Sequence, residues 1–325
     1  MDIENRKQNR FFVRILLFTL YGLAGLAILL NSCSNNKMGK NTDWEEYNLK
    51  GKVKSFKEFS YEAVEKFGEI EKGYKKREYE WTDDKYVTFN NLGKIIEENI
   101  YNSNGKLRRK STFKHDNKGN QIEENIYNPD GSLRSKFIYK YNDKGNQIER
   151  NIYNSDGNIF DKWTYLYDDK GNLIETSMYN PNGSLDKKWL SKYDNKGNLI
   201  ENKLSNSKGK NTYKYNDKGN LIEENKYYFI DGSLLERYTY KYDDKGNLIE
   251  KNIFNSEGKH SSKFTNKYDE KGNLIEENIY HFTGSSDIKR NYEYVFDKKG
   301  NWISKVKFED KVPTYILERE IEYFK

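Results

Sequence analysis

The nine residues YDDKGNLIE run from Tyr167 to Glu175, and the same nine letters return from Tyr242 to Glu250. Close copies begin at Tyr141, Tyr193, Tyr215 and Tyr268. The glycines of these copies recur mostly at intervals of 26 residues, and a second set of glycines lies between them. A phrase that recurs at a nearly fixed interval is typical of a repeat scaffold. Each unit therefore contains two turns and two connecting segments.

The residues at the turns indicate what the connecting segments are. NPDG at Asn128 and NPNG at Asn180 place Asn first, Pro second and Gly fourth, the order of a type I turn closed by a glycine with positive φ. Between turns lie segments such as Gln121 to Tyr127 and Leu133 to Tyr141, whose richness in Ile, Tyr and Phe is typical of strands. We therefore predict an all-β fold, a repetitive meander of antiparallel hairpins that forms one continuous curled sheet of about 20 strands.

The turn at Asn128 also predicts a register. If Asn128 pairs with Ser132, the expected cross-strand pairs are Tyr127 with Leu133, Glu124 with Lys136 and Ile122 with Ile138. Acidic IEEN strands would then alternate with basic KYKY strands through the array. The carboxylates of the IEEN segments are accordingly interpreted as ladder partners, in preference to paired catalytic acids.

The composition predicts a thin structure. Hydrophobic residues make up 34% of the 325 residues, charged residues 33%, and the mean hydropathy is −1.10. Such values approach those of disordered chains, but aromatic residues reach 15% and there are only three prolines, which argues against disorder. Tyrosine packs its ring while its hydroxyl stays wet, so it suits a sheet with limited burial. We expect no single thick core.

The N-terminal residues are typical of a targeting segment. Basic residues precede the apolar run Ile15 to Leu30, which is too short to span a bilayer and is followed by Cys33, the only cysteine. The letters LNSC resemble the lipobox of bacterial lipoproteins. The resemblance implies that residues 1–32 are a lipoprotein signal peptide and that Cys33 is lipidated, in preference to an uncleaved anchor. Residues 33–43 are polar and read as a flexible tether.

The remaining chain divides into an array and two ends. Terminal units of a repeat array are expected to be atypical. The predicted segments are an N-terminal β cap at 44–92, with strands at Val53 to Tyr61 and Tyr74 to Trp81, YD-type hairpin repeats at 93–300, and a C-terminal capping hairpin at 301–325 with its turn at Glu309 to Pro313. On the last strand we expect Glu318, Arg319, Glu320 and Glu322 to discourage pairing with another molecule.

The recurring YDDKGNLIE phrase resembles the YD repeats of the RHS family over about two thirds of the chain, from Gly93 to Trp302. The resemblance implies a curling sheet of hairpins and roles in toxin encapsulation, surface attachment or sugar contact. No terminal toxin-like segment follows the array in this sequence. We expect the array to be too short to enclose cargo, so the resemblance implies the fold more firmly than the role.

Motifs for catalysis are not found in the sequence. His115, His260 and His281 stand beside turns without metal-ligand spacing, and we interpret them as surface residues. The DDKGN turns lack the ligand order of a calcium loop, so we predict no metal and no cofactor. The formal charge of +6 falls to +4 once the four basic and two acidic residues of 1–32 are set aside. A positive charge this small does not indicate a nucleic-acid-binding surface. We predict that the protein is not an enzyme.

The predicted function is therefore non-enzymatic binding in the bacterial cell envelope, by a lipoprotein facing the periplasm or the surface of the outer membrane. The candidate binding surface consists of aromatic side chains expected on one face, namely Tyr139, Tyr141, Trp163, Tyr165 and Tyr167. The expected partner is a glycan or a protein, besides the membrane that holds the lipid on Cys33. The main alternative is a passive envelope or shell-like protein, which a rolled sheet with its apolar face closed inside would favour. A toxin-immunity component is a further, less favoured alternative.

Overall fold

The computed structural model describes residues 42–74, 83–282, 284 and 286–325. The predicted signal peptide, Cys33, most of the tether and all but the first residue of the strand expected at 74–81 lie outside these residues. The elements are α2 (Asp43–Glu46), β1 (Val53–Lys66), β2 (Glu69–Lys72), β3 (Asp84–Phe89), β4 (Ile95–Tyr101), β5 (Leu107–His115), β6 (Gln121–Tyr127), β7 (Leu133–Tyr141), β8 (Gln147–Asn154), β9 (Ile159–Tyr167), β10 (Leu173–Tyr179), β11 (Leu185–Tyr193), β12 (Leu199–Leu204), β13 (Lys210–Tyr215), β14 (Leu221–Tyr227), β15 (Leu234–Tyr242), β16 (Leu248–Asn255), β17 (His260–Tyr268), β18 (Leu274–His281), β19 (Ile288–Phe296), β20 (Trp302–Glu309) and β21 (Val312–Tyr323).

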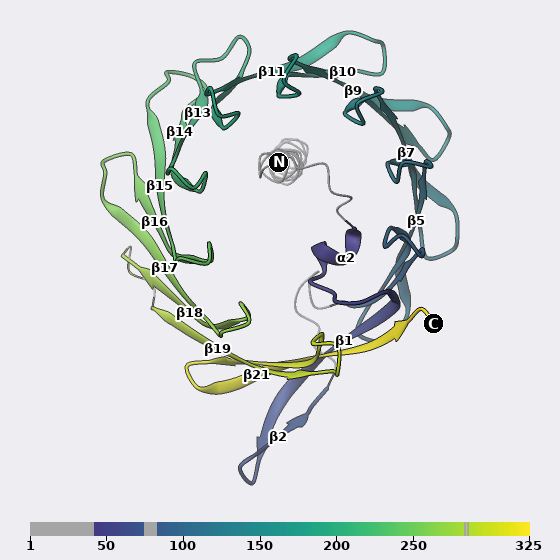
Figure 1. Ribbon diagram of the computed structural model, residues 1–325, viewed down its shortest axis with the longest axis vertical. Coiled ribbons are helices and arrows are strands. Elements are labelled where there is room, and N and C mark those ends of the chain that lie inside the picture. Colours follow the sequence, from purple (N-terminus) through teal and green to yellow (C-terminus); the bar gives the residue numbers. More distant parts are fainter. Residues whose placement is uncertain (1–41, 75–82, 283, 285) are drawn as a thin grey trace, which may run out of the picture.

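These strands form one closed, 20-strand antiparallel barrel (Figure 1). From β3 to β21 each strand pairs with its neighbours in chain order, and β1 closes the ring by pairing with both β3 and β21. β2 pairs only with the far half of β1, and the two project from the ring as a hairpin. The predicted all-β meander of hairpins is confirmed, and the sheet closes on itself.

Each KGN-type turn is held by the side chain of its own first residue, which is Asp or Asn. In the copy at 168–172, the Asp168 Oδ1 atom accepts the backbone N–H of Asn172 at 2.8 Å, and the Asn172 Nδ2 atom donates to Asp168 Oδ2 at 2.8 Å. Gly171 between them has φ +88°, a left-handed conformation that a side chain would strain. The residues DxKGN are therefore explained by turn formation.

The predicted register is wrong by one residue. Tyr127 pairs with Leu133 as expected, but a bulge follows, so that Glu124 lies opposite Phe137 and Asn125 opposite Lys136. The pairing of Glu124 with Lys136 is thus not formed, and Lys136 instead contacts Glu123 at 3.1 Å. The extra residue is Arg134, which lies between Leu133 and Ser135 on β7 and has no partner on β6.

The helix α2 identifies the inner face of the barrel, because it lies within the ring (Figure 1). Tyr47, just after α2, packs on Phe56 of β1 with ring centroids 5.1 Å apart, so Phe56 faces inward. Side chains alternate along a strand and paired residues share a face. Following the registers around the ring from Phe56 places the second Glu of each IEEN segment inside and the first Glu outside.

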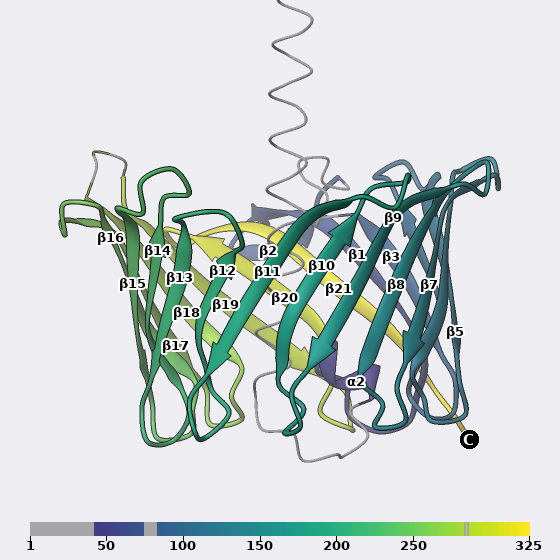
Figure 2. The same cartoon turned by 90° about the horizontal axis from the view of Figure 1, so that it is seen from above.

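The compact apolar core of the described residues lies at the closing seam and not around the barrel. It consists of Leu49, Val53, Phe56, Val87 and Phe89, against which Trp44, Tyr47, Ile95, Ile321 and Tyr323 pack. Figure 2 shows α2 near one rim of the barrel, inside the wall. Residues after α2 reach across the seam, since Lys50 N–H donates to the Asn301 side chain and the Asn301 amide donates to the Lys50 carbonyl. This segment ties the first strands to the turn between β19 and β20.

The charged residues on β21 have a different role from the expected protection of an edge. β21 pairs with β1 on one side and β20 on the other, so it is not an edge strand. Its charged side chains form ion pairs across the seam and with β2, namely Lys54–Glu322 at 2.7 Å, Lys57–Glu320 at 3.8 Å, Lys72–Glu318 at 2.6 Å and Glu58–Arg319 at 2.7 Å. These charges contribute to closing the barrel within one molecule.

Candidate binding surface: the inner wall of the barrel

The five aromatic residues predicted as a binding surface lie together on the inner wall. β7 contributes Tyr139 and Tyr141, and β9 contributes Trp163, Tyr165 and Tyr167. In the register, Tyr139 lies opposite Arg150 of β8, and Arg150 lies opposite Trp163. A barrel of 20 strands is wider than its side chains can fill, since barrels of about 16 to 18 strands already leave an aqueous channel. The inner wall therefore lines a lumen and is half-buried.

The tyrosine that opens each repeat is a structural tie. The Tyr141 hydroxyl donates to the backbone carbonyl of Gln121 at 2.7 Å, and the Tyr167 hydroxyl donates to that of Gln147 at 2.8 Å. The same bond recurs for Tyr193 to Leu173, Tyr242 to Leu221, Tyr268 to Leu248 and Tyr294 to Leu274. Burial raises the pKa of Tyr141 and of Tyr167 to about 12. Two of the five predicted residues thus commit their hydroxyls to joining neighbouring repeats.

Tyr139 contacts a buried carboxyl on the inner wall. Its hydroxyl donates to Glu124 Oε2 at 3.0 Å. Burial raises the pKa of Glu124 above the usual range of a glutamate, although the hydrogen bond from Tyr139 opposes the rise. The pKa of Tyr139 is also raised, first by burial and then by the Glu124 charge. This pair is a polar contact within the wall, next to the aromatic column.

A stack of three side chains occupies the neighbouring sector. Trp163 of β9 stacks on Trp189 of β11 with ring centroids 5.5 Å apart and planes 10° apart. The Arg150 guanidinium covers the Trp163 ring at 4.9 Å. Arg150 Nε and Trp163 Nε1 are buried donors without a hydrogen-bond partner among the described residues. Sequence reasoning missed Arg150 and Trp189, although Arg150 stands at a position that is Glu in four of the nine copies.

A second inner cluster combines charges and tyrosines on β14, β15 and β16. The Tyr240 hydroxyl donates to the buried Glu224 carboxylate at 3.0 Å, and Tyr238 donates to Glu236. The Lys251 ammonium lies over the Tyr238 ring at 5.1 Å, and burial lowers the pKa of Lys251. The inner wall thus changes in character from one sector to the next.

The outer wall, in contrast, carries one arrangement repeated many times. Glu123 accepts from Lys114 at 2.8 Å and from Lys136 at 3.1 Å, and Asn125 donates to it at 2.9 Å. These hydrogen bonds, that from Lys114 first, hold the pKa of Glu123 at about 2. Equivalent groups of Glu with two lysines centre on Glu149, Glu201, Glu250 and Glu276. The predicted ladder of opposite charges is therefore the outer surface.

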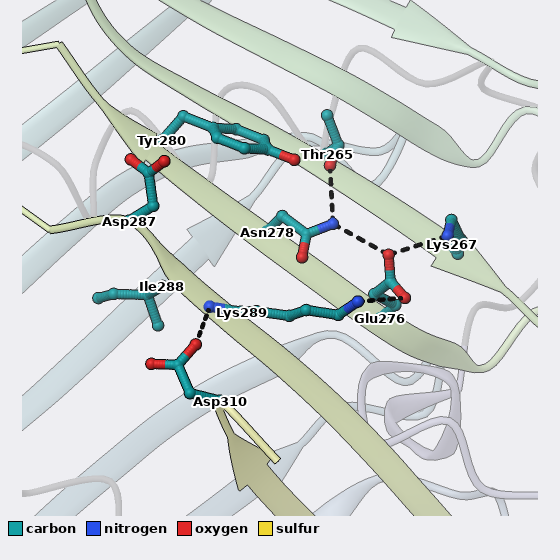
Figure 3. Close-up of a pocket in the computed structure, with 9 residues that line it drawn as sticks. All are labelled: Thr265, Lys267, Glu276, Asn278, Tyr280, Asp287, Ile288, Lys289 and Asp310. Carbon is teal, nitrogen blue, oxygen red and sulfur yellow. Dashed lines mark hydrogen bonds and ion pairs between the residues drawn. The ribbon is translucent and has the colours of Figure 1, made fainter.

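A shallow depression of about 470 Å³ lies on this outer wall between β18 and β19 (Figure 3). There the two strands pair over only four residue pairs, from Glu276 with Asn291 to Ile279 with Ile288. Its polar groups already bind one another, since the Asn278 amide donates to Glu276 at 2.9 Å. The depression is a widened part of the ladder, and we do not assign a site to it.

Within the described residues no group of three or more His, Cys, Asp or Glu side chains could hold a metal ion. The three histidines lie apart in the chain: His115 ends β5, His260 begins β17 and His281 ends β18. Burial lowers the pKa of His115, and the His260 ring packs against Phe254 with centroids 4.2 Å apart. No helix in the part of the chain that the structure describes is long and apolar enough to cross a bilayer.

No protein-family profile matches this sequence, and no curated protein matches it. Among solved structures, a mutant Tc holotoxin pore of Photorhabdus luminescens is 14% identical over 69% of this chain and 13% of its own, with a TM-score of 0.38. A TcdB2–TccC3 crystal structure is 13% identical over 69% of this chain and 16% of its own, with a TM-score of 0.32. A porin-like protein from Bacteroides uniformis is 12% identical over 83% of this chain and 98% of its own, with a TM-score of 0.32. The chain spans less than a fifth of the two toxin chains, and likenesses this low place it in no family.

Proposed function

We propose that this chain is a non-enzymatic, lipid-anchored scaffold of the bacterial cell envelope, and that its barrel binds a glycan or protein partner on the inner wall. The observation that carries the proposal is the difference between the two walls. The outer wall repeats one ion-pair ladder, whose groups satisfy each other, as around Glu123. The inner wall presents half-buried aromatic and charged side chains that differ from sector to sector, such as Arg150 and Trp163, to a wide lumen. Aromatic rings with polar edges are suited to sugars and to protein surfaces.

The charged residues of the outer wall also support a barrel that is surrounded by water and not by lipid. A membrane-spanning barrel carries an apolar band on its outer face. Here the outward positions of successive strands carry Lys and Glu, for example Lys140 and Lys162 around Glu149. Attachment to the membrane would then depend on the lipid at Cys33. A Cys33→Ser chain is expected to leave the membrane fraction or to stall in processing, and an unchanged membrane-bound product would contradict the lipid anchor.

The inner-wall proposal is tested with a glycan array followed by calorimetry on the chain from residue 34 onward. Trp163→Ala is expected to weaken binding of the best glycan at least tenfold. Leu166→Ala is the matched control, because Leu166 lies on the same strand, faces outward and is 54% exposed. Equal losses for both variants would reject the inner wall as the binding surface.

A passive, shell-like role is the second candidate, and the closed ring favours it. Rolling the sheet hides the aromatic face from other large surfaces, so an open adhesive face is not presented. In that case inner-wall substitutions change only stability, and neither the glycan array nor protein partners show saturable binding. The calorimetry therefore separates the two candidates.

A further inference from the structure

Equivalent positions can be compared within this one chain, because the same kind of strand occurs nine times. In the strands that follow the KGN-type turns, the third residue faces outward and the fourth faces the lumen. The outward residue is Glu in eight of nine copies: Glu97, Glu123, Glu149, Glu175, Glu201, Glu223, Glu250 and Glu276, with Ser304 in the last. The ladder therefore requires one residue type at this position.

The inward residue next to it is not constant. Around the ring the fourth residue is Glu98, Glu124, Arg150, Thr176, Asn202, Glu224, Lys251, Glu277 and Lys305. The inward position of the intervening strands varies as well, in the order Ser111, Phe137, Trp163, Trp189, Asn211, Tyr238, Phe264 and Tyr292. Both positions belong to strands of the same kind in the same barrel, so the fold itself does not demand this variation. The sectors of the inner wall are chemically distinct.

From this juxtaposition we propose that the sector β8–β11, with Arg150, Trp163 and Trp189, binds a carboxylate-bearing sugar of an acidic glycan. The inference rests on the proposed inner-wall function and names its ligand class and place. The ligand would then bind at one distinct sector, and not through many equivalent contacts along the array.

Arg150 is the charged group that the ligand would meet. Most outer-wall lysines form ion pairs with carboxylates, and the inward Arg109 contacts Glu98 at 3.0 Å. For Arg150, in contrast, no carboxylate of the described residues lies within 4.0 Å, and its contact is the Trp163 ring. Asp161 faces the same sector without forming an ion pair with Arg150, and burial raises the pKa of Asp161. A guanidinium in this state favours a bidentate anionic acceptor from outside the chain.

The remaining groups of the sector favour a sugar beside that anion. Arg150 Nε and Trp163 Nε1 are buried within the wall, so the polar contact with a ligand would be made by the terminal Nη donors of the half-buried Arg150, which require acceptor oxygens. The Trp163–Trp189 stack adds an apolar aromatic surface at the same place. An acidic sugar combines a carboxylate, hydroxyl oxygens and apolar C–H faces in one ring. An acidic peptide offers carboxylates but fewer neutral acceptors on an apolar face.

The test is calorimetry on the full chain in detergent with oligogalacturonate and its methyl ester, which share a backbone and differ in charge. The acid is expected to bind at least tenfold more tightly than the ester, and Arg150→Gln is expected to remove that preference. Arg134→Gln is the matched control, because Arg134 is an exposed arginine of the neighbouring strand β7, and it should bind like the parent chain. Circular dichroism melts establish that both variants are folded.

Four results would overturn the proposal, and they differ in what else they reject. Equal affinity for acid and ester, or equal loss in Arg150→Gln and Arg134→Gln, rejects the acidic sector while inner-wall binding through Trp163 can still stand. Binding of oligo-glutamate with the same dependence on Arg150 and at least equal affinity assigns the sector to polypeptides instead. Absence of binding to every glycan, with no effect of Trp163→Ala on any partner, rejects the proposed function as well.

Discussion

The Tyr141 hydroxyl donates a 2.7 Å hydrogen bond to the backbone carbonyl of Gln121, 20 residues earlier in the chain. Gln121 begins β6 and Tyr141 ends β7, so the bond joins the ends of two neighbouring strands at one rim. Because the bond recurs in other repeats, it explains why each copy of the phrase opens with tyrosine. The repeated phrase is a scaffold element.

Removing this bond is expected to lower stability without changing the fold. Tyr141→Phe removes the hydrogen bond that the Gln121 carbonyl accepts and should cost about 1 kcal/mol of unfolding free energy. Tyr153→Phe is the control, since Tyr153 lies on the outer face of β8 and no hydrogen bond of its hydroxyl to a described residue is found. Urea unfolding followed by tyrosine fluorescence measures both, and equal stability of the two variants would contradict the role of the tie.

The outer ladder predicts a loss of stability in acid. The pKa values of Glu123 and Glu250 are about 2, below the ordinary value of 4.5, because lysines donate hydrogen bonds to their carboxylates. Depressed carboxyl pKa values add stability that is fully present above about pH 4.5 and is lost as the pH falls through about 2. Melting temperatures should therefore be nearly constant from pH 7 to 5 and fall steeply between pH 4.5 and 2. The double variant Glu123→Gln, Glu250→Gln should show a shallower fall, and an unchanged melting temperature down to pH 2 would contradict the ladder's contribution.

At the seam, replacement of Arg319 is expected to lower the stability of the protein most. Arg319 and Glu58 are 7% and 8% exposed and their side chains are 2.7 Å apart, and burial would raise the pKa of Glu58 if Lys85 and Arg319 did not hold it low. Arg319→Ala removes one partner of this pair and should cost about 3–5 kcal/mol. Lys54→Ala breaks the exposed Lys54–Glu322 pair and should cost much less, because solvent screens exposed charges. Chemical unfolding compares them, and similar small costs would show that the seam does not depend on the buried pair.

Much of the fold could be predicted because the residue types of each repeat indicate its turns and strands. The turn expected at Asn128 is formed, since Asn128 N–H donates to the Ser132 carbonyl at 2.9 Å. The register beyond it was wrong because a bulge at Arg134 follows the Tyr127–Leu133 pair, and residue types alone do not indicate a bulge. Closure of the ring could not be predicted, because it depends on contacts such as Glu58 with Arg319, which are far apart in sequence.

The candidate site could be predicted only in part. The aromatic columns were placed on one face correctly, but tyrosines and lysines alone do not indicate whether that face turns inward or outward. Trp189 and Arg150 could not be singled out from the sequence, because they stand where the repeats differ and the sequence does not show which of these positions face inward. Comparing outward and inward positions requires the face assignment that α2 supplies.

The central claim, that a ligand lies inside the barrel, is tested most directly by thiol labelling in a Cys33→Ser chain, where Cys33 is otherwise the only cysteine. Thr176 faces inward between Tyr165 and Trp189, whereas Leu166 faces outward and is 54% exposed. In Thr176→Cys, saturating glycan should slow modification by a charged thiol reagent at least tenfold, and in Leu166→Cys it should leave the rate unchanged. Equal rates with and without the glycan at Thr176→Cys, or protection at Leu166→Cys instead, would contradict binding on the inner wall.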